Sequence, residues 1–349
     1  MTRFAIQPAP LPEASSVPEA LPGQPDVSFI VATYNAAPFV EPAIQSALDQ
    51  RDAAIEVVVL DDASSDATPD IVEAMARRDP RIVLIRGTVN RGPSAARNQA
   101  MARARGRWLA VLDGDDLVLP GRSRALLDLA ALSGADIVAD NFERFFAEDA
   151  GGGGTMIPLG SEPYAFAVDI ASFLRANHAF GDSRFTLGAV KGMFRAEFLK
   201  SQGITHREGL DFGEDFHFIL KCLQARARFL VTSQVYYKYR KHRGSQSWRM
   251  KPSHLEQLER MIAEEGLGGG LVQDADLAAA ARGYTASFEK ASQFVDVVDL
   301  LKRRRIGDAL VKVAIRPAIW PLLLRQGGAA VLNRIRPSVR GASKGGTRA

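Results

Sequence analysis

Short apolar runs alternate along the chain with longer segments in which apolar residues recur every three or four positions. The runs have the length and β-branched content of buried strands, and the segments between them have helical spacing. Strands are predicted over residues 27–32, 55–60, 81–85, 108–112 and 136–140. Helices are predicted over 37–50, from 68, from 93 and over 123–132. This alternation predicts an α/β fold with a Rossmann-like, mainly parallel sheet flanked by helices.

The alternation becomes less regular at four consecutive glycines, residues 151–154, and we interpret this run as a loop. Beyond it, a helix is predicted around 213–223 and a strand over 235–239. From Ser253 to about residue 324 the spacing is helical, so a helical C-terminal extension is predicted to follow the sheet.

The two ends of the chain differ in composition from this periodic body. Residues 1–25 contain six prolines and no continuous apolar segment, which predicts a disordered lead-in and not a signal peptide. The predicted organisation is a lead-in over 1–25, one α/β domain over 26–250, a helical extension over 251–325 and a basic flexible tail over 326–349.

The charge is distributed unevenly, although the net charge of the 349 residues is only +4. From Lys302 onward there are twelve Lys and Arg against one acid, Asp308, so this end carries +11 and residues 1–301 carry −7. Such a segment suggests an anionic partner. Because apolar and basic residues interleave over 306–324, as in interfacial segments, we expect peripheral contact with an anionic membrane through 302–340 and no nucleic-acid partner.

Two further observations concern the compartment. No stretch approaches the roughly 20 apolar residues of a membrane span. The single cysteine, Cys222, lies in an apolar pattern and excludes intrachain disulfides, which is typical of a reducing compartment. We therefore expect a cytoplasmic protein, peripheral on the inner face of the cytoplasmic membrane.

Three carboxylates follow the apolar strand 108–112 in the sequence Asp113-Gly114-Asp115-Asp116. The C-terminal ends of strands in open α/β sheets are where ligands bind. Three carboxylates placed there repel one another, and Mg²⁺ or Mn²⁺ prefers such hard oxygen ligands. The alternative is a solvated acidic turn, because Asp and Gly are ordinary turn residues.

Polar residues also follow the other predicted strands, at 33–35, 61–62 and 90–93. In a parallel sheet these ends share one edge, so the residues can converge on one ligand. Tyr34 can lie against a nucleobase, Asp62 can accept from a base N–H, and Asp113 and Asp115 can hold a metal that bridges two phosphates. The pattern indicates a nucleoside diphosphate site without a P-loop, since neither GxxxxGK[ST] nor GxGxxG occurs.

Several strings, in this order, resemble the family 2 glycosyltransferases of the GT-A fold, in particular those of bacterial exopolysaccharide synthesis. The resemblance covers about residues 26–250. It rests on VSFIVATYN (27–35), VVVLDDASSDAT (57–68), NRGPSAARN (90–98), LAVLDGDDLVLP (109–120), GED (213–215) and YRKHRGSQS (239–247).

The resemblance implies a role for each residue at the strand ends. Asp115 would be a direct metal ligand, Asp113 would lie between metal and ribose, and Asp116 would support the turn. His242 would complete the metal shell or, like Arg240, contact the diphosphate.

By the same resemblance, Ala32, Tyr34 and Asp62 line the nucleoside pocket. Arg97 would orient Asp113 or a phosphate; the alternative is an ordinary helix-surface arginine paired with an acid.

The Glu214-Asp215 pair matches the acidic pair of the family and begins an amphipathic helix. An inverting transfer needs one general base to take the proton of the acceptor hydroxyl, and we assign that role to Asp215. The alternative is that both acids only stabilise the positive end of the helix.

The expected function is inverting, metal-dependent transfer of a sugar from a nucleotide-sugar donor, a UDP-sugar, to a glycan or lipid-linked saccharide. Two alternatives come from other classes. A haloacid-dehalogenase-type phosphohydrolase also has an Asp-x-Asp after an apolar strand, but near the start of its fold. A non-catalytic nucleotide-sugar-binding module would not need Asp215.

Overall fold

The structure is a computed structural model that describes residues 23–146, 152–157, 162–178, 186–210, 212–242, 252–266, 274–321 and 323–324. The chain divides into two compact units, residues 1–285 and 286–349. Most of the predicted lead-in and all of the predicted tail lie outside the described residues, so those assignments and the predicted domain boundaries stay predictions.

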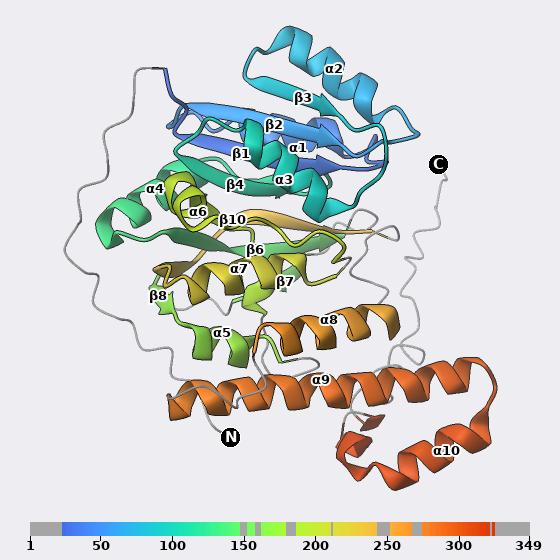
Figure 1. Ribbon diagram of the computed structural model, residues 1–349. Coiled ribbons are helices and arrows are strands. Elements are labelled where there is room, and N and C mark those ends of the chain that lie inside the picture. Colours follow the sequence, from blue (N-terminus) through green and yellow to red (C-terminus); the bar gives the residue numbers. More distant parts are fainter. Residues whose placement is uncertain are drawn as a thin grey trace, which may run out of the picture. The chain divides into compact units, whose positions relative to one another are not determined.

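The first half of the sheet is a block of four parallel strands in the order β3-β2-β1-β4 (Figure 1). Their bounds are β1 (Val27–Thr33), β2 (Ile55–Asp61), β3 (Ile82–Arg86) and β4 (Trp108–Asp113). β2 is buried along its whole length and β1 along nearly all of it, which explains their continuous apolar runs.

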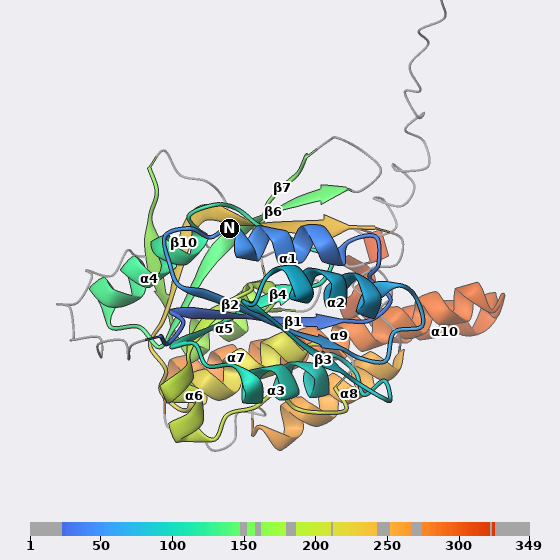
Figure 2. The same ribbon diagram turned by 90° about the horizontal axis from the view of Figure 1, so that it is seen from above.

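The helices that connect these strands cover both faces of the block. They are α1 (Val40–Leu48), α2 (Thr68–Arg78) and α3 (Pro93–Arg103). The chain moves outward from β1 to β3 and then returns to β4, so right-handed crossovers place α1 and α2 on one face and α3 on the other (Figure 2). Small buried residues of α3, Ala96 and Ala100, allow close packing on the sheet.

The second half of the sheet is mixed. The short β9 (Met193–Arg195) pairs antiparallel with both β4 and β6 (Ile137–Phe146), and β10 (Phe229–Lys241) pairs parallel with β6. Three short antiparallel strands complete it, namely β5 (Leu117–Val118), β7 (Gly152–Thr155) and β8 (Ala165–Val168).

The interpretation of the glycine run as a loop is wrong, because β7 includes Gly152–Gly154 and pairs with β6. Glycine has no side chain, so a glycine strand shows neither apolar alternation nor an apolar run, and the pattern could not reveal it.

The remaining helices of the first unit lie around this second half of the sheet. They are α4 (Arg122–Ser133), α5 (Ile170–Ala176), α6 (Ala196–Gln202), α7 (Glu214–Gln224), α8 (Pro252–Glu264) and the 3-10 turn η1 (Leu187–Ala189). α7 buries most of its length, including Cys222, and burial raises the pKa of that thiol to about 12, as expected for a packing residue.

The long helix α9 (Ala275–Lys302) begins in the first unit and ends in the second. The second unit continues with α10 (Ile306–Ile315) and the 3-10 turn η3 (Pro317–Ile319). It has a small core of its own, in which Val297, Ala309 and Ile319 are buried. Among the described residues, no helix combines the length and the apolar character needed to cross a membrane.

Candidate active site

The ends of β1, β2 and β4 bring the predicted site residues to one edge of the sheet. Ala32 lies opposite Asp113 in the β1–β4 register, and Thr33 lies opposite Asp61 in the β1–β2 register. A Cβ on Gly114 would come within 2.8 Å of Cγ2 of Thr33. The turn after β4 therefore packs directly on the end of β1, which explains the glycine in this acidic turn.

The loops after β1 and β2 are tied together by side-chain hydrogen bonds. The backbone N–H of Asn35 donates to Oγ of Ser64 at 2.9 Å, and Oδ1 of Asn35 accepts from the N–H of Ser65 at 2.9 Å. Tyr34, in the same loop, is 53% exposed. An aromatic ring is thus presented on a braced loop at the edge of the sheet.

Asp62 lies at the same edge but has a bracing role that the sequence did not predict. Its carboxylate accepts from the backbone N–H groups of Arg91 at 2.9 Å and Gly92 at 2.8 Å, and the residue is buried. It thereby anchors the loop that leads into α3. Each carboxylate oxygen has two lone pairs, so Asp62 can still accept from a ligand.

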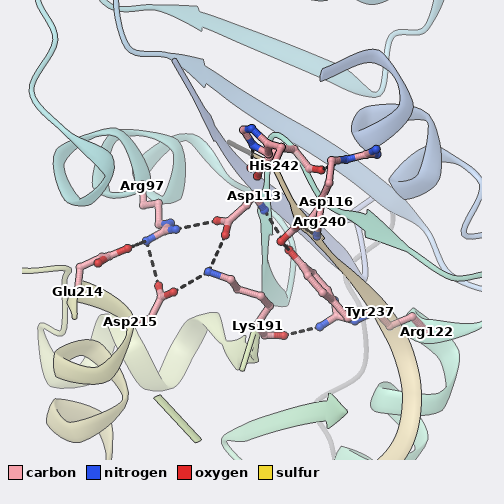
Figure 3. Close-up of polar contacts among 11 residues, drawn as sticks. Arg97, Asp113, Asp116, Arg122, Lys191, Glu214, Asp215, Tyr237, Arg240 and His242 are labelled. Atoms are coloured by element: carbon pink, nitrogen blue, oxygen red, sulfur yellow. Dashed lines mark hydrogen bonds and ion pairs between the residues drawn. The ribbon is translucent and has the colours of Figure 1, made fainter. Parts of the chain in front are cut away.

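Arg97 links the acidic turn to the start of α7. Its buried guanidinium donates to Asp113 at 2.8 Å, Glu214 at 3.1 Å and Asp215 at 3.0 Å (Figure 3). Only 5% of the side chain is exposed, so Arg97 is not a helix-surface arginine. Residues more than 100 positions apart in sequence are therefore held together around one cation.

Lys191, just before β9, is a second cation in this cluster. Its ammonium lies 2.7 Å from Oδ2 of Asp113 and 2.6 Å from Oδ2 of Asp215, with 6% of the side chain exposed. We call Arg97, Asp113, Lys191, Glu214 and Asp215 the ionic cluster. The sequence did not assign Lys191 to this cluster; its signal was a lysine within the largely apolar string GAVKGMF.

These contacts set the charges of the ionic cluster. Burial alone raises the pKa of Asp113 and Asp215, but the charges of Lys191 and Arg97 reverse the effect and hold both pKa values below the usual range. Burial and the neighbouring Asp215 raise the pKa of Glu214. Asp113 and Asp215 are thus carboxylates at neutral pH.

The backbone of Lys191 is held by a buried ion pair. Arg122 contacts Asp140 at 2.9 Å with both side chains essentially inaccessible, and it also donates to the carbonyl oxygen of Lys191. The Arg122 guanidinium lies 5.4 Å from the ring centre of Tyr237. This pair therefore connects α4 and β6 to two residues that surround the acidic turn.

Asp116 is the buried carboxylate of the acidic turn and supports it through hydrogen bonds to β10. Its carboxylate accepts from the hydroxyl of Tyr237 at 2.8 Å and from the backbone N–H of Arg240 at 2.7 Å, and only 1% of the residue is exposed. Burial and the charges of Asp113 and Asp115 raise its pKa well above the usual value. Because only 1% of Asp116 is exposed, a metal can reach its carboxylate less easily than that of Asp115.

Asp115 is the most exposed carboxylate of the turn, with 31% of its side chain accessible. Its Oδ2 lies 2.9 Å from Nε2 of His242, whose ring packs on Phe39 with centroids 4.7 Å apart. Nε of Arg240 donates to the backbone oxygen of Asp115 at 2.6 Å. Burial and the charge of Asp113 raise the pKa of Asp115.

The donor set fits a hard divalent cation. One oxygen each of Asp113, Asp115 and Asp116 lies within 4.8 Å of the others. Contacts and burial separate the three: Asp115 is the most exposed, Asp113 contacts two cations, and Asp116 is buried. His242, beside Asp115, offers an imidazole nitrogen. The last residues of the string 239–247, from 243 on, lie outside the described residues.

His206 is a buried histidine next to the ionic cluster. His206 stacks on Phe218 with ring centroids 4.0 Å apart, and its backbone exchanges two 2.8 Å hydrogen bonds with the side chain of Asn98. Burial and the charge of Arg97 lower its pKa to about 3, so His206 is neutral at physiological pH.

Comparison with known proteins gives concordant results. A family model described as Glycosyl transferase family 2 matches residues 28–196. The succinoglycan biosynthesis protein ExoO of Rhizobium meliloti (strain 1021) is 34% identical over 322 residues, which cover 91% of this chain and 88% of the relative.

Two solved structures share the fold. The S. aureus TarS 1-349 structure in complex with UDP-GlcNAc has a TM-score of 0.58 at 23% identity and covers 77% of this chain and 73% of that one. The mannosyltransferase PcManGT from Pyrobaculum calidifontis, in complex with GDP-Man and Mn²⁺, has a TM-score of 0.56 at 19% identity, with coverage of 96% and 85%. The predicted GT-A fold is confirmed.

Proposed function

The chain belongs to glycosyl transferase family 2, and we propose that it transfers a sugar, with inversion, from a UDP-sugar to a hydroxyl of a glycan or lipid-linked saccharide. Its membership of this family excludes the phosphohydrolase alternative. The observation that carries the proposal is the ionic cluster, which places a charged carboxylate of α7 opposite the acidic turn. A relative named for succinoglycan biosynthesis supports an exopolysaccharide or cell-surface glycan as product, and a structural neighbour in complex with UDP-GlcNAc supports a UDP-sugar as donor.

Asp215 is the proposed general base. It would take the proton of the acceptor hydroxyl while that oxygen bonds to the anomeric carbon and the bond from this carbon to the diphosphate breaks. The carboxylate is deprotonated because Arg97 and Lys191 hold its pKa low, and each oxygen that contacts a cation keeps a second lone pair for the hydroxyl. Glu214 shares Arg97 and helps to orient it.

The nucleoside would lie on the braced edge of the sheet. Tyr34 offers an exposed ring for the base, Asp62 offers carboxylate oxygens to a base N–H, and Ala32, the last residue but one of β1, lies opposite Asp113. Asp113 would receive the ribose, with Arg97 orienting its carboxylate. A short residue such as Ala32 leaves room for a ligand to approach the strand end.

A divalent ion, Mn²⁺ or Mg²⁺, is the proposed cofactor, with Asp115, Asp113 and His242 as its protein ligands. When bound, such an ion supplies positive charge to the leaving diphosphate. Asp116 and Tyr237 hold the turn that presents these ligands.

The proposed location is the cytoplasm, at the inner face of the cytoplasmic membrane, with peripheral contact through residues 302–340. The support is the excess of basic over acidic residues in this segment, because anionic lipids attract such segments by about 1 kcal/mol per Lys or Arg near the surface.

The test is thermal unfolding of the full chain with UDP-, GDP- and dTDP-sugars, each with and without Mn²⁺. A donor that binds only the folded state raises the melting temperature, and we expect UDP-sugars with metal to raise it most. Asp115→Asn should lose the part of the stabilisation that depends on metal. Stabilisation that is the same without metal would contradict the metal site, and binding without any release of UDP would favour the non-catalytic module.

A further inference from the structure

The second unit carries, on and around α10, an exposed apolar surface unlike any other in the described residues. Among all described residues, eleven large apolar side chains are exposed. Seven of these lie between residues 301 and 324, so the apolar exposure is concentrated in one short segment of the second unit. These seven are Leu301, Ile306, Leu310, Val311, Ile315, Trp320 and Leu324, at 48–78% exposure. We call them the apolar face.

The packing of the second unit fixes which side of α10 faces outward. Ala309 is buried with Val297 and Ile319, and Val313 packs against this core one turn further along. Lys312 contacts Asp296 of α9 at 2.6 Å and holds the same side inward. The opposite side therefore has no partner within the described part of its own unit, and its exposure is a property of the folded helix.

Trp320 adds an aromatic ring to the apolar face in a fixed position. Its indole N–H donates to the carbonyl oxygen of Val313 at 2.8 Å, while half of the residue stays accessible. The polar atom of the ring is thus satisfied within the protein, and the exposed remainder is apolar. Tryptophan of this kind is enriched where one end of a side chain meets lipid.

Basic residues lie on both sides of α10 in the sequence, among the residues of the apolar face. Lys302–Arg305 immediately precede α10 and Arg316 follows it. Arg303 and Arg305 contact Asp299 and Asp308, and the excess of positive charge remains because the segment from Lys302 onward has a single acid. An apolar helix face beside cationic side chains is complementary to a surface with anionic headgroups and a hydrocarbon interior.

We propose that the apolar face inserts at the surface of an anionic lipid membrane, with the flanking Lys and Arg residues bound to lipid phosphates. This deepens the location proposed above and rests on that part of the proposed function, not on the identity of the donor. With ten residues, α10 is about 15 Å long and cannot cross a hydrocarbon core of about 30 Å, so it lies in the plane of the interface.

The charges disfavour a second copy of the chain as the partner. A two-fold interface places the same patch on both partners, so the basic residues around one apolar face would meet those around the other. Buried interface centres are depleted of charge, and like charges brought together oppose association. A lipid surface offers the opposite charge at the same distance from the apolar region.

The experiment is co-sedimentation of the full chain with vesicles of phosphatidylcholine, alone or with phosphatidylglycerol, at low and high salt. We expect binding to the anionic vesicles and little to the neutral ones. The double variant Leu310→Glu/Ile315→Glu should lower the partition coefficient by about tenfold or more at either salt, because it places charge in the inserted face. Lys302→Gln/Arg304→Gln should weaken binding mainly at low salt, where the attraction between charges is least screened.

Leu132→Glu is the matched control, because Leu132 is 56% exposed on α4 of the first unit and should leave vesicle binding unchanged. A blue shift of tryptophan fluorescence on vesicle addition, absent in Trp320→Phe, would place that ring in lipid. Equal binding by wild type and Leu310→Glu/Ile315→Glu would overturn the proposal. So would a wild-type dimer in light scattering that this variant dissociates while vesicles bind neither form.

UDP release with a soluble acceptor serves as the readout that separates the two proposals. A chain that transfers sugar but ignores vesicles would contradict only the membrane surface. A chain that binds vesicles through the apolar face but neither binds nor turns over a nucleotide sugar would contradict only the proposed transfer.

Discussion

The negative charges on the two sides of the acidic turn, Asp113 on one and Asp115 and Asp116 on the other, are balanced in different ways. Asp113 faces two permanent cations, Arg97 and Lys191, and its pKa is lowered. Asp115 and Asp116 face an imidazole, a phenol and backbone N–H groups, and burial raises both of their pKa values. The carboxylate of Asp113 is therefore neutralised by two cations of the protein itself, whereas the carboxylate of Asp115 contacts an imidazole, and the neighbouring Arg240 donates to the backbone oxygen of Asp115. A cation from solution should be attracted to the Asp115 side.

Asp215→Asn tests the Asp113 side most severely. Removal of a general base typically costs about 10²–10⁴-fold in rate, and we expect kcat to fall by that amount while the donor still binds. The measurement is steady-state UDP release together with calorimetric titration of the donor. Glu214→Gln is the matched neighbour, and we expect a smaller loss because Glu214 contacts only Arg97 in the cluster. Full turnover by Asp215→Asn would show that the base is elsewhere.

Asp115→Asn tests the other side of the turn. A neutral amide is a weaker ligand for a hard cation than a carboxylate is. Loss of an outer-shell partner lowers metal affinity about 10–100-fold, so we expect the affinity for Mn²⁺ to fall by at least that factor. The measurement is Mn²⁺ titration by electron paramagnetic resonance. Asp128→Asn, on the exposed face of α4, is the control for loss of one negative charge. Unchanged Mn²⁺ affinity would reverse the comparison between the two sides.

Lys191→Met removes one of the two permanent cations. Asp113 and Asp215 would then be buried with less compensation, and breaking a buried ion pair costs about 3–5 kcal/mol of unfolding free energy. A shift of about 1 Å in a reacting group can lower the reaction rate about 10²-fold. We therefore expect kcat to fall by up to that factor, with little change in the KM for the donor. Urea unfolding and kinetics check both effects, with Lys200→Met of α6 as the control. Partial rescue by Lys191→Arg is expected; wild-type kcat in folded Lys191→Met would contradict the role.

Tyr237→Phe tests how much the buried carboxylate of Asp116 depends on the phenol of Tyr237. The phenol donates to Asp116 and accepts from the backbone N–H of Asp113 at 3.3 Å, with 1% of the residue exposed. Its loss leaves a buried carboxylate short of one donor, which costs about 1–3 kcal/mol of unfolding free energy. Tyr236→Phe, on the neighbouring position of β10, is the matched control in urea unfolding. A cost no greater than that of the control would show that Asp116 does not depend on this phenol.

The smallest expected effect concerns pH. The pKa of His206 is about 3 in the folded state and near 6.5 when unfolded, so the unfolded state binds an extra proton between these values. Its contribution to stability is present above about pH 6.5 and is lost as the pH falls, by up to about 1.4 kcal/mol per pH unit. His206→Phe should flatten the pH dependence of urea unfolding between about pH 6.5 and pH 5 relative to wild type. Parallel curves would show that His206 titrates normally.

The sequence predicted the first half of the sheet well and the second half poorly. β1, β2 and β4 are largely buried strands whose polar residues come at their ends, so pattern and chemistry are both local in sequence. This is why the strand pattern alone could assign Asp62 and Asp113 to one edge of the sheet. The α/β class followed from the same strands, whereas the GT-A fold was implied by the resemblance to family 2 glycosyltransferases.

The parts that could not be predicted depend on pairing between distant segments. β9 has three residues, and β10 shifts its register against β6 twice between Val231 and Tyr237. Lys191 precedes β9 and Tyr237 lies in β10, so their places beside the acidic turn depend on strand pairing that no periodicity in the sequence encodes. The apolar and basic interleaving over 306–324 was visible, but which side of α10 faces outward depends on how the helix packs in its own unit.

The hydrogen bonds that brace the edge of the sheet have a consequence for the thermodynamics of ligand binding. Asn35 joins the loops after β1 and β2, and Asp62 joins the loop before α3. Little backbone entropy then remains to be lost when a donor arrives, so association should be fast and limited by diffusion and charge. The heat-capacity change of binding should correspond to covering the ring of Tyr34 and not to ordering of a loop.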